Sequence, residues 1–372
     1  MNTRRLLLAL FLAATLGPFV PLAEAEPMFL SKQYTRCATC HFSPTGGGLL
    51  TAYGRSLSNV ELSTFKSGAA ASREHEFLYG ALGDSLGALQ LGVTLRPARL
   101  EVDFTGGSLS RNFMMNADVT AAYQKGRWTL YAEIGRQGRT AKAEIDSFEH
   151  WIAFQSAKGL GIRAGRFLPA YGVRLADHTT YTRRSLGFDM HDQIYGVELS
   201  RSSEKALFQV SFGPGRAAAL IDDDGTAAFT ASGRAQFDLA GSKTLVLSAL
   251  RRGASDRSGA DTLGGVAFGF APSRRWSVWT EGNVRSQEGG PGSSYTLANE
   301  TSFEAHRGVW LKFTPQLRTN PGDTGGGVIR TGAALDWLPR THMNLGLLYY
   351  RDKDRRSSAV TKTLLAQLHL YF

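Results

Sequence analysis

From about residue 85 onward, the chain is a series of segments about ten residues long in which apolar residues alternate with small or polar ones. The segment from Ala227 to Leu239 shows the alternation most clearly. One of its faces comprises Ala227, Phe229, Ala231, Ala235, Phe237 and Leu239, and the other comprises Thr230, Ser232, Arg234, Gln236 and Asp238. Segments of this length and period are typical of a transmembrane β-barrel, with an apolar face for lipid and a polar face for a wet lumen.

The pattern predicts an all-β fold, a porin-like barrel of about sixteen antiparallel strands that occupies residues 89–372. Seven short turns are expected near residues 125–126, 157–158, 202–203, 240–241, 272–273, 307 and 339–340. Long polar loops are expected between the other neighbours. Bacterial barrels have short periplasmic turns and longer outer loops, so we expect both ends of the barrel on the periplasmic side.

The last segment supports a barrel over a soluble β-sandwich. Its apolar residues share one face, and they are Leu364, Ala366, Leu368, Leu370 and Phe372. Such a strand would invite aggregation in water, whereas closure removes the edge and lipid accepts the apolar face. Aromatic residues near strand ends suit interfacial girdles or the lumen, and they include Trp276, Trp310, Trp337, Tyr349 and Tyr350.

The first 25 residues have the features of a secretory signal peptide. Arg4 and Arg5 precede an apolar run from Leu6 to Leu22, and Ala23-Glu24-Ala25 is an A-x-A cleavage site. The alternative is a retained membrane anchor, which the glycine and prolines within the run disfavour. Export through the inner membrane and a barrel together predict location in the outer membrane of a Gram-negative bacterium.

The chain is basic, with a formal net charge of +10 that becomes +9 without Arg4, Arg5 and Glu24. Export makes nucleic acid an unsuitable partner. The positive charge instead suits acidic lipid head groups of the outer membrane or a basic pore lumen.

Candidate chemistry is concentrated in Cys37-Ala38-Thr39-Cys40-His41, which holds the only two cysteines of the chain. Cys-x-x-Cys-His is the attachment motif of haem c. Cys37 and Cys40 would form thioethers to one covalent haem, and His41 would be the proximal iron ligand. Zinc is the alternative, but a structural zinc site normally adds another Cys or His pair, and none lies nearby.

Residues 26–72 form the expected monohaem segment, and residues 73–88 form a linker to the barrel. Gly46 to Gly48 allow the backbone to bend around a macrocycle. The helical spacing of Leu49, Leu50, Tyr53 and Leu57 predicts that they cover one haem face. So short a segment has little core of its own, so we expect it to plug the barrel mouth or lumen.

The distal haem ligand is not defined by the pattern. Met28 is the tentative choice, because methionine is a common sixth ligand that raises the haem potential. Plain packing of Met28 and an open sixth position remain alternatives. The other candidates are His75, His178, His191, Met114, Met115 and Met190.

Two expected outer loops contain notable polar residues. The loop of about residues 170–190 includes Tyr171, Arg174, Asp177, Tyr181 and Arg183. By resemblance to sixteen-stranded porins it would fold inward and narrow the lumen, and the alternative is a solvated loop. Asp222-Asp223-Asp224-Gly225 offers oxygen ligands for Fe(II) or Ca(II), but the spacing lacks the full calcium-loop pattern and a hydrated acidic turn is the favoured interpretation.

The layout resembles the fused monohaem cytochrome c–porin family of the outer membrane, whose best-known members are iron-oxidising. The shared features are Pro27-Met28-Phe29, Cys37 to His41 and Tyr53-Gly54-Arg55, followed by a porin. Iron-oxidising members follow the haem motif with a Phe-Pro-Glu-Leu-type segment, where this chain has residues 43–50. The resemblance therefore implies haem and barrel more directly than it implies iron as the donor.

We accordingly expect an outer-membrane electron conduit. It would relay electrons between an extracellular donor or acceptor, with Fe(II) as the leading candidate, and a periplasmic c-type cytochrome or other carrier. The sequence shows no catalytic constellation for bond chemistry. One alternative is a porin for small anions with the haem segment as plug or gate, supported by lumen-facing Arg163, Arg234 and Arg318. Another is a haem enzyme or sensor with an open iron position.

Overall fold

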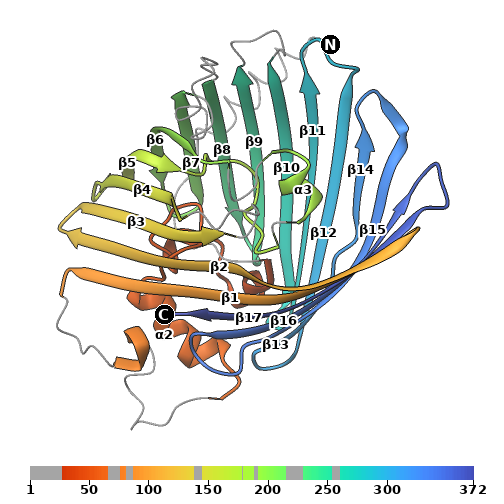
Figure 1. The fold of residues 1–372 in the computed structure, drawn as a ribbon. Coiled ribbons are helices and arrows are strands. Elements are labelled where there is room, and N and C mark those ends of the chain that lie inside the picture. The colour runs from red at the N-terminus through yellow and green to blue at the C-terminus, as the bar shows by residue number, and fades with distance from the viewer. Residues whose placement is uncertain are drawn as a thin grey trace.

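The protein folds as one closed, antiparallel β-barrel (Figure 1). The computed structural model describes residues 27–65, 76–80, 87–137, 145–177, 179–187, 192–214, 229–253 and 260–372. Within them each strand pairs with its neighbours along the chain, except that β13 and β14 pair with β12 and β15 and not with each other. Strand β1 pairs with β17 to close the ring, with Thr94 opposite Tyr371. The strands are β1 (Leu89–Phe104), β2 (Gly107–Lys125), β3 (Trp128–Gln137), β4 (Asp146–Gln155), β5 (Leu160–Phe167), β6 (Ile194–Ser202), β7 (Ala206–Pro214), β8 (Phe229–Leu239), β9 (Lys243–Gly253), β10 (Asp261–Ser273), β11 (Trp276–Gln287), β12 (Ser293–His306), β13 (Val309–Phe313), β14 (Gln316–Asn320), β15 (Asp323–Trp337), β16 (Met343–Asp354) and β17 (Val360–Tyr371).

The seventeen strand elements form a barrel of sixteen strands, because β13 and β14 are two halves of one strand. Both halves pair with β12 and with β15. Pro315 lies between them, and proline has no N–H with which to continue the hydrogen-bond ladder. The expectation of a sixteen-stranded barrel is confirmed.

The connections are short as expected at one end of the barrel and differ from the expectation at four places at the other. All seven predicted short turns are present. The prediction of long loops between all other neighbours is wrong for four connections. Those of β11–β12 and β16–β17 are five residues long, no longer than the β15–β16 turn at the other end, and those of β1–β2 and β14–β15 are two residues long. Thr105-Gly106 and Pro321-Gly322 join these strands directly, and Gly106 and Gly322 adopt positive φ, which lets the chain reverse in a tight turn.

The two faces of the strands follow the predicted alternation. In β8 the side chains of Phe229 and Leu239 are exposed and those of Thr230, Arg234 and Gln236 are buried; Ala227 lies outside the described residues. Exposed apolar side chains recur around the outer surface, for example Val119, Leu130, Val197, Val210, Phe212, Val266, Phe313, Ile329 and Leu347. An outer face of this kind suits hydrocarbon, and closure leaves no unpaired edge.

The predicted wet lumen is corrected: the inward polar side chains of the described strands are largely buried. Gln236 is fully buried and Thr230 nearly so. The reason is that two other parts of the chain occupy the interior, as described below. Of the aromatic residues near strand ends, Trp276 and Tyr349 are exposed, whereas Trp310 and Tyr350 point inward and are buried.

Short helical turns make up the remaining described structure. They are η1 (Pro27–Lys32), η2 (Cys37–Thr39), α2 (Ala52–Leu57), η3 (Ser58–Leu62), η5 (Phe77–Gly80) and α3 (Tyr181–Arg184). The Thr51 hydroxyl caps α2 by accepting a hydrogen bond from Gly54 N at 3.1 Å. Among the described residues, no helix has both the length and the apolar character needed to cross a membrane.

Replacement of Val210 tests the lipid-facing surface. Val210 lies at the middle of β7 with 59% of its surface exposed. We expect Val210→Arg to destabilise the folded protein in bilayers by ~2–4 kcal/mol, because a charge on the lipid face must be buried in hydrocarbon. Urea titration in phospholipid vesicles measures this, with Val210→Leu as the control. Equal stability of the two variants would contradict a membrane-facing position.

Candidate haem-binding site

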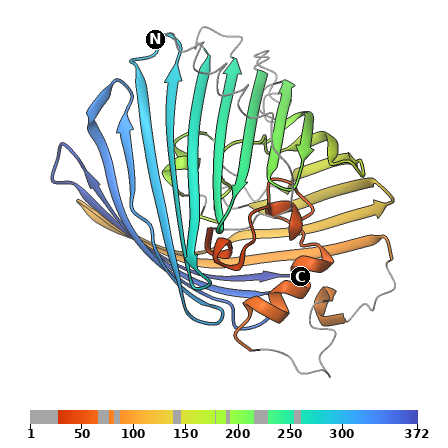
Figure 2. The ribbon, with the colours of Figure 1, turned by 180° about the vertical axis from the view of Figure 1, so that it is seen from behind.

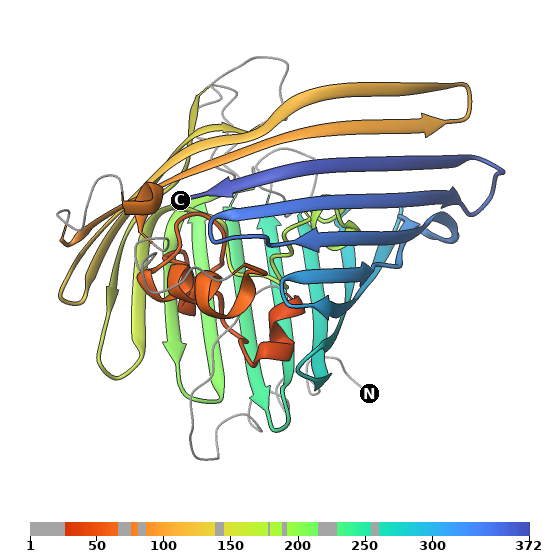
Figure 3. The same ribbon diagram turned by 90° about the horizontal axis from the view of Figure 1, so that it is seen from below.

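Residues 27–65, called the plug here, lie inside the barrel at the end of the short turns (Figures 2 and 3). Arg36 donates to Asp238 Oδ2 from Nη2 at 2.9 Å and to the carbonyl of Ser203, in the β6–β7 turn, at 2.7 Å. On another side of the ring, Thr64 N donates to the carbonyl of Leu338 at 2.8 Å, and Arg307 donates to the carbonyl of Val60 at 2.6 Å. These contacts confirm the expectation that the segment plugs the barrel.

The local fold of the plug brings the three residues of the haem motif onto one turn. The amides of Cys40 and His41 both donate to the carbonyl of Cys37, at 3.1 and 2.9 Å. His41 then pairs with Leu50 as an isolated β-bridge, so the intervening residues form a loop. That loop contains Gly46, Gly47 and Gly48, all with positive φ.

Cys37, Cys40 and His41 line one internal cavity of about 260 Å³. Its walls come from three parts of the molecule. The plug contributes Met28, Leu50 and Leu57, the inward loop after β5 contributes Arg174 and Arg183, and the barrel wall contributes Arg96, Asn116, Asp118, Glu133, His369 and Tyr371. The cavity therefore combines apolar plug residues on one side with polar wall residues on the other.

The residues around the cavity fit a covalently attached haem. The two cysteines form no disulfide. The Nδ1 atom of His41 is buried without a hydrogen-bond partner among the described residues, which a ligand bond or a rearranged ring would satisfy. Burial, aided by Arg174, lowers the pKa of His41 to about 4, so the ring is in the neutral form that binds iron.

Two glycines make room around the motif. A Cβ on Gly46 would lie 3.0 Å from Cys37 Sγ, and a Cβ on Gly54 would lie 2.4 Å from the carbonyl oxygen of Cys40. Gly54 is thus required by the close packing of α2 against the motif. The neighbouring Arg55 is buried and donates to Gln90 Oε1 on β1 at 2.8 Å, which links the plug to the wall.

The zinc alternative has less support from the geometry. Burial raises the pKa of the Cys40 thiol to about 11, so this thiol is protonated when no group is bound to it. Within the described part of the chain, no group of three or more His, Cys, Asp or Glu side chains is arranged to hold a metal ion.

The expected apolar cover of the haem is partly wrong. Leu50 and Leu57 do line the cavity, and Leu57 packs with Cys40 and Leu62. Leu49 instead packs against Tyr131 and Trp151 of the barrel wall, and Tyr53 is 51% exposed. The helical spacing misled because the helix starts only at Ala52, so Leu49 precedes it.

The loop after β5 folds inward, as the porin resemblance implied. Tyr171 is buried and its hydroxyl donates to Asn283 Oδ1 at 2.8 Å. Arg174 donates to the carbonyl of Gly46 and to Glu149 Oε1, so this loop contacts the plug directly. His178 lies outside the described residues.

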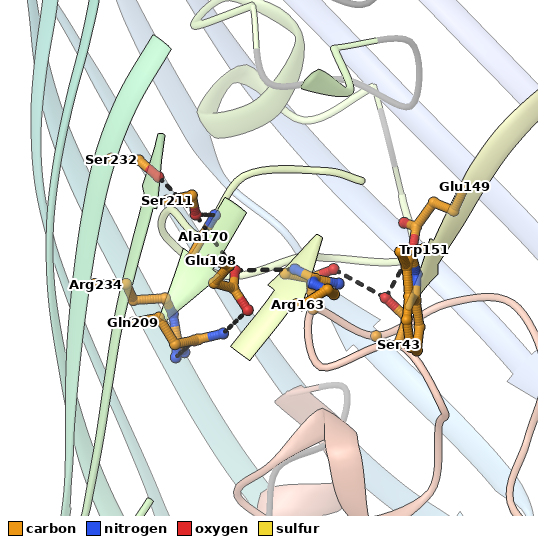
Figure 4. Close-up of polar contacts among 12 residues, drawn as sticks. Ser43, Glu149, Trp151, Arg163, Ala170, Glu198, Gln209, Ser211, Ser232 and Arg234 are labelled. Carbon is orange, nitrogen blue, oxygen red and sulfur yellow. Dashed lines mark hydrogen bonds and ion pairs between the residues drawn. The ribbon is translucent and has the colours of Figure 1, made fainter. Parts of the chain in front are cut away.

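A polar network on the inner wall ties these parts together (Figure 4). Ser43 of the plug donates to Glu149 Oε2 at 3.0 Å, and Trp151 Nε1 donates to the same oxygen at 3.2 Å. Farther along, Arg163 donates to Glu198 Oε2 at 2.9 Å.

The lumen arginines of the sequence analysis are placed as follows. Arg163 is buried and forms an ion pair with Glu198. Arg234 is buried and donates to the carbonyl of Gly172 and to Gln209 Oε1. Arg318 is exposed, and its guanidinium lies 5.4 Å from the centre of the Tyr181 ring.

Of the candidate distal ligands, only Met28 lines the cavity among those that the structure describes. Met115 packs with Ala98 and Leu365 instead, and Met114 borders an apolar groove with Trp337 on the outer side. The remaining candidates, His75, His178, Met190 and His191, lie outside the described residues, as does the sequence Asp222–Gly225.

The sequence analysis missed His369, which lines the same cavity as His41. A signal was available. The alternation that assigned Leu368 and Leu370 to the outer face of β17 places His369 on the inner face.

The comparisons with known proteins bear on the barrel. No family model and no curated protein matches the chain in sequence. In structure it is similar to OprB of Pseudomonas putida, with a TM-score of 0.64, 8% identity and coverage of 84% of this chain and 99% of that one. It is also similar to the outer membrane channel DcaP of Acinetobacter baumannii, with a TM-score of 0.58, 10% identity and coverage of 76% and 97%. An anion-selective porin from Comamonas acidovorans is similar with a TM-score of 0.59, 9% identity and coverage of 76% of this chain and 99% of that one. At these identities the likeness establishes the fold, a barrel of the outer-membrane porin type.

A single glycine tests how tightly the plug fits the wall. Gly48 has φ +59°, and a Cβ there would lie 2.0 Å from the hydroxyl oxygen of Tyr131. Gly126 has the same φ but nothing within 4 Å of the added atom. We expect Gly48→Ala to cost more stability than Gly126→Ala, whose cost of about 1–2 kcal/mol is backbone strain alone. Thermal unfolding and limited proteolysis of the plug measure the difference, and equal effects would refute the plug's placement against Tyr131.

Proposed function

We propose that this protein is an outer-membrane electron conduit in which one haem c, held by the plug, relays electrons to or from a periplasmic carrier. The observation that carries the proposal is the position of Cys37, Cys40 and His41 on one cavity enclosed by the barrel. Thioethers from the two cysteines would hold the group, and His41 would bind its iron. When bound, a haem supplies reversible one-electron chemistry whose potential depends on its ligands and its burial.

The position of the plug supports a periplasmic partner. Arg36 of the plug contacts the β6–β7 turn and Arg307 of the β12–β13 turn contacts Val60 of the plug, and such short turns lie at the periplasmic end in bacterial barrels. The plug also exposes Tyr53, Val60 and Phe65, whose exposed fractions are 51%, 63% and 54%. Aromatic and apolar side chains at a rim of this kind suit transient docking of a soluble cytochrome or another electron carrier.

The extracellular donor is proposed by resemblance, with Fe(II) first. Residues 43–50 differ from the segment found in iron-oxidising members, and the structure gives this difference a local role. Ser43 binds Glu149 and the three glycines make the turn that Arg174 contacts. The segment thus fixes the plug to the wall and the inward loop.

Removal of the thiols tests the proposal. We expect Cys37→Ser/Cys40→Ser protein to be exported without covalent haem, because a serine hydroxyl cannot form the thioethers. The pyridine haemochrome spectrum measures attachment, and electron exchange across proteoliposomes, between an enclosed reductant and an external Fe(III) chelate, measures relay. Thr39→Ser, within the motif but not a proposed ligand, is the matched control. Wild-type protein without a c-type haemochrome would refute the proposal.

A second function, a porin for small anions with the plug as gate, is favoured by the comparisons. Two of the solved structures described above are an outer membrane channel and an anion-selective porin, and they support this function better than they support electron transfer. The basic character of the chain agrees with it. In such a porin, current would flow only when the plug or the inward loop moves.

Conductance separates the two functions. The buried pair of Arg36 and Asp238 anchors the plug, and breaking a buried pair typically costs about 3–5 kcal/mol. We expect low current through wild-type protein in planar bilayers and frequent openings of Arg36→Met. Arg251→Met, which breaks an exposed pair with Glu288, is the control and should behave like wild type. A large steady ohmic current through haem-loaded wild-type protein would favour the porin.

A further inference from the structure

His369 lines the cavity from strand β17 of the barrel wall, whereas the haem motif lines it from the plug. It lies in β17, directly paired with Asn344 of β16, and both side chains line the cavity that contains the haem motif. His369 retains accessible surface although it faces the inside of the barrel, because that surface borders the cavity.

We propose that His369 is the distal ligand of the haem iron, so that the plug supplies one axial imidazole and the barrel supplies the other. This inference rests on the proposed attachment of haem c. It gives the barrel a direct part in the redox centre, since the sixth ligand would come from the last strand of the barrel.

The surroundings of His369 orient its ring. The Arg96 guanidinium lies with Nη2 3.2 Å from His369 Nδ1, and the Tyr371 ring lies 5.1 Å away, centre to centre. Arginine can only donate, so Nδ1 accepts and Nε2 is the nitrogen left for iron. Binding through Nε2 displaces its proton to Nδ1 or to solvent, and a proton on Nδ1 would require Arg96 to withdraw.

Met28, the choice made from the sequence, is held differently. It also lines the cavity, but it is only 2% exposed and packs in an apolar cluster with Trp310 and Leu338. Its side chain therefore already has a packing role at the edge of the plug. His369 is half-buried, and it lines the cavity with a nitrogen ligand that is not packed into an apolar cluster, so it is the better iron ligand of the two.

The two ligands differ in their effect on the haem. Methionine raises the reduction potential of a haem relative to a second histidine. Ligation by His369 would therefore give a lower potential than ligation by Met28, and would suit exchange with stronger reductants.

Spectroscopy of the full-length, haem-loaded protein tests the proposal. We expect wild-type protein to be low-spin with bis-histidine electron paramagnetic resonance signals and without the near-infrared charge-transfer band of methionine ligation. His369→Ala should lose the low-spin signal and bind carbon monoxide as soon as it is reduced, and added imidazole should restore the low-spin spectrum. His369→Met should gain the methionine band and a higher potential. Met28→Leu removes the other candidate ligand, and the bis-histidine signals should persist in it.

The outcomes are distinguishable. Haem content by pyridine haemochrome is measured for every variant, so loss of the distal ligand is separated from loss of attachment. A wild-type methionine band that disappears in Met28→Leu would overturn the inference, as would an unchanged low-spin spectrum in His369→Ala. If His369→Ala fails to fold, the wild-type spectrum alone still decides between histidine and methionine. Wild-type protein without covalent haem would overturn the proposed function and this inference with it.

Discussion

Closure of the sheet between β1 and β17 is the constraint on which the rest of the structure depends. A backbone inside hydrocarbon has no water to bind, so each strand must find partners on both sides. The seam provides them by pairing residues from Thr94 with Tyr371 to Asp103 with Lys362. Closure of sixteen strands also fixes a lumen wider than inward side chains alone can fill, since eight strands already suffice for a filled interior.

The plug fills that space from the short-turn end of the barrel and the loop after β5 fills it from the other end. The cavity lies between them and the barrel wall. The plug is held at the short-turn end by Arg36 and Arg307, while the loop after β5 approaches it with Arg174. Neither the plug nor the loop has a core large enough to fix its own conformation. Each is ordered by contacts with the other and with the wall, so the shape of the cavity is a property of the whole barrel.

The sequence predicted those features that depend on local alternation and missed those that depend on packing between distant segments. The positions of the strands and their two faces could be predicted because successive side chains alternate between the lipid-facing and the inner side, as in β8. The tight outer turn at Gly106 was missed because a glycine marks a turn but not the length of the loop around it. Leu49 was misassigned because helical spacing cannot show where a helix begins. His369 was missed because only the apolar residues of β17 were assigned to a face, and the residues between them, which point inward, were not considered as ligands.

The charges of the described interior bear on the choice between conduit and pore. A net charge of +10 suggests a path for anions, but three of the inward cations form ion pairs: Arg163 with Glu198, Lys312 with Asp336 and Arg330 with Asp352. Buried cations that already share hydrogen bonds with carboxylates offer little attraction to a passing anion, and freeing them would leave unpaired buried charge. The paired charges instead form ion pairs that hold neighbouring strands, the plug and the loop in place. An interior organised in this way suits a centre that must stay in place while electrons move, and it makes solute passage depend on displacing the plug or the loop.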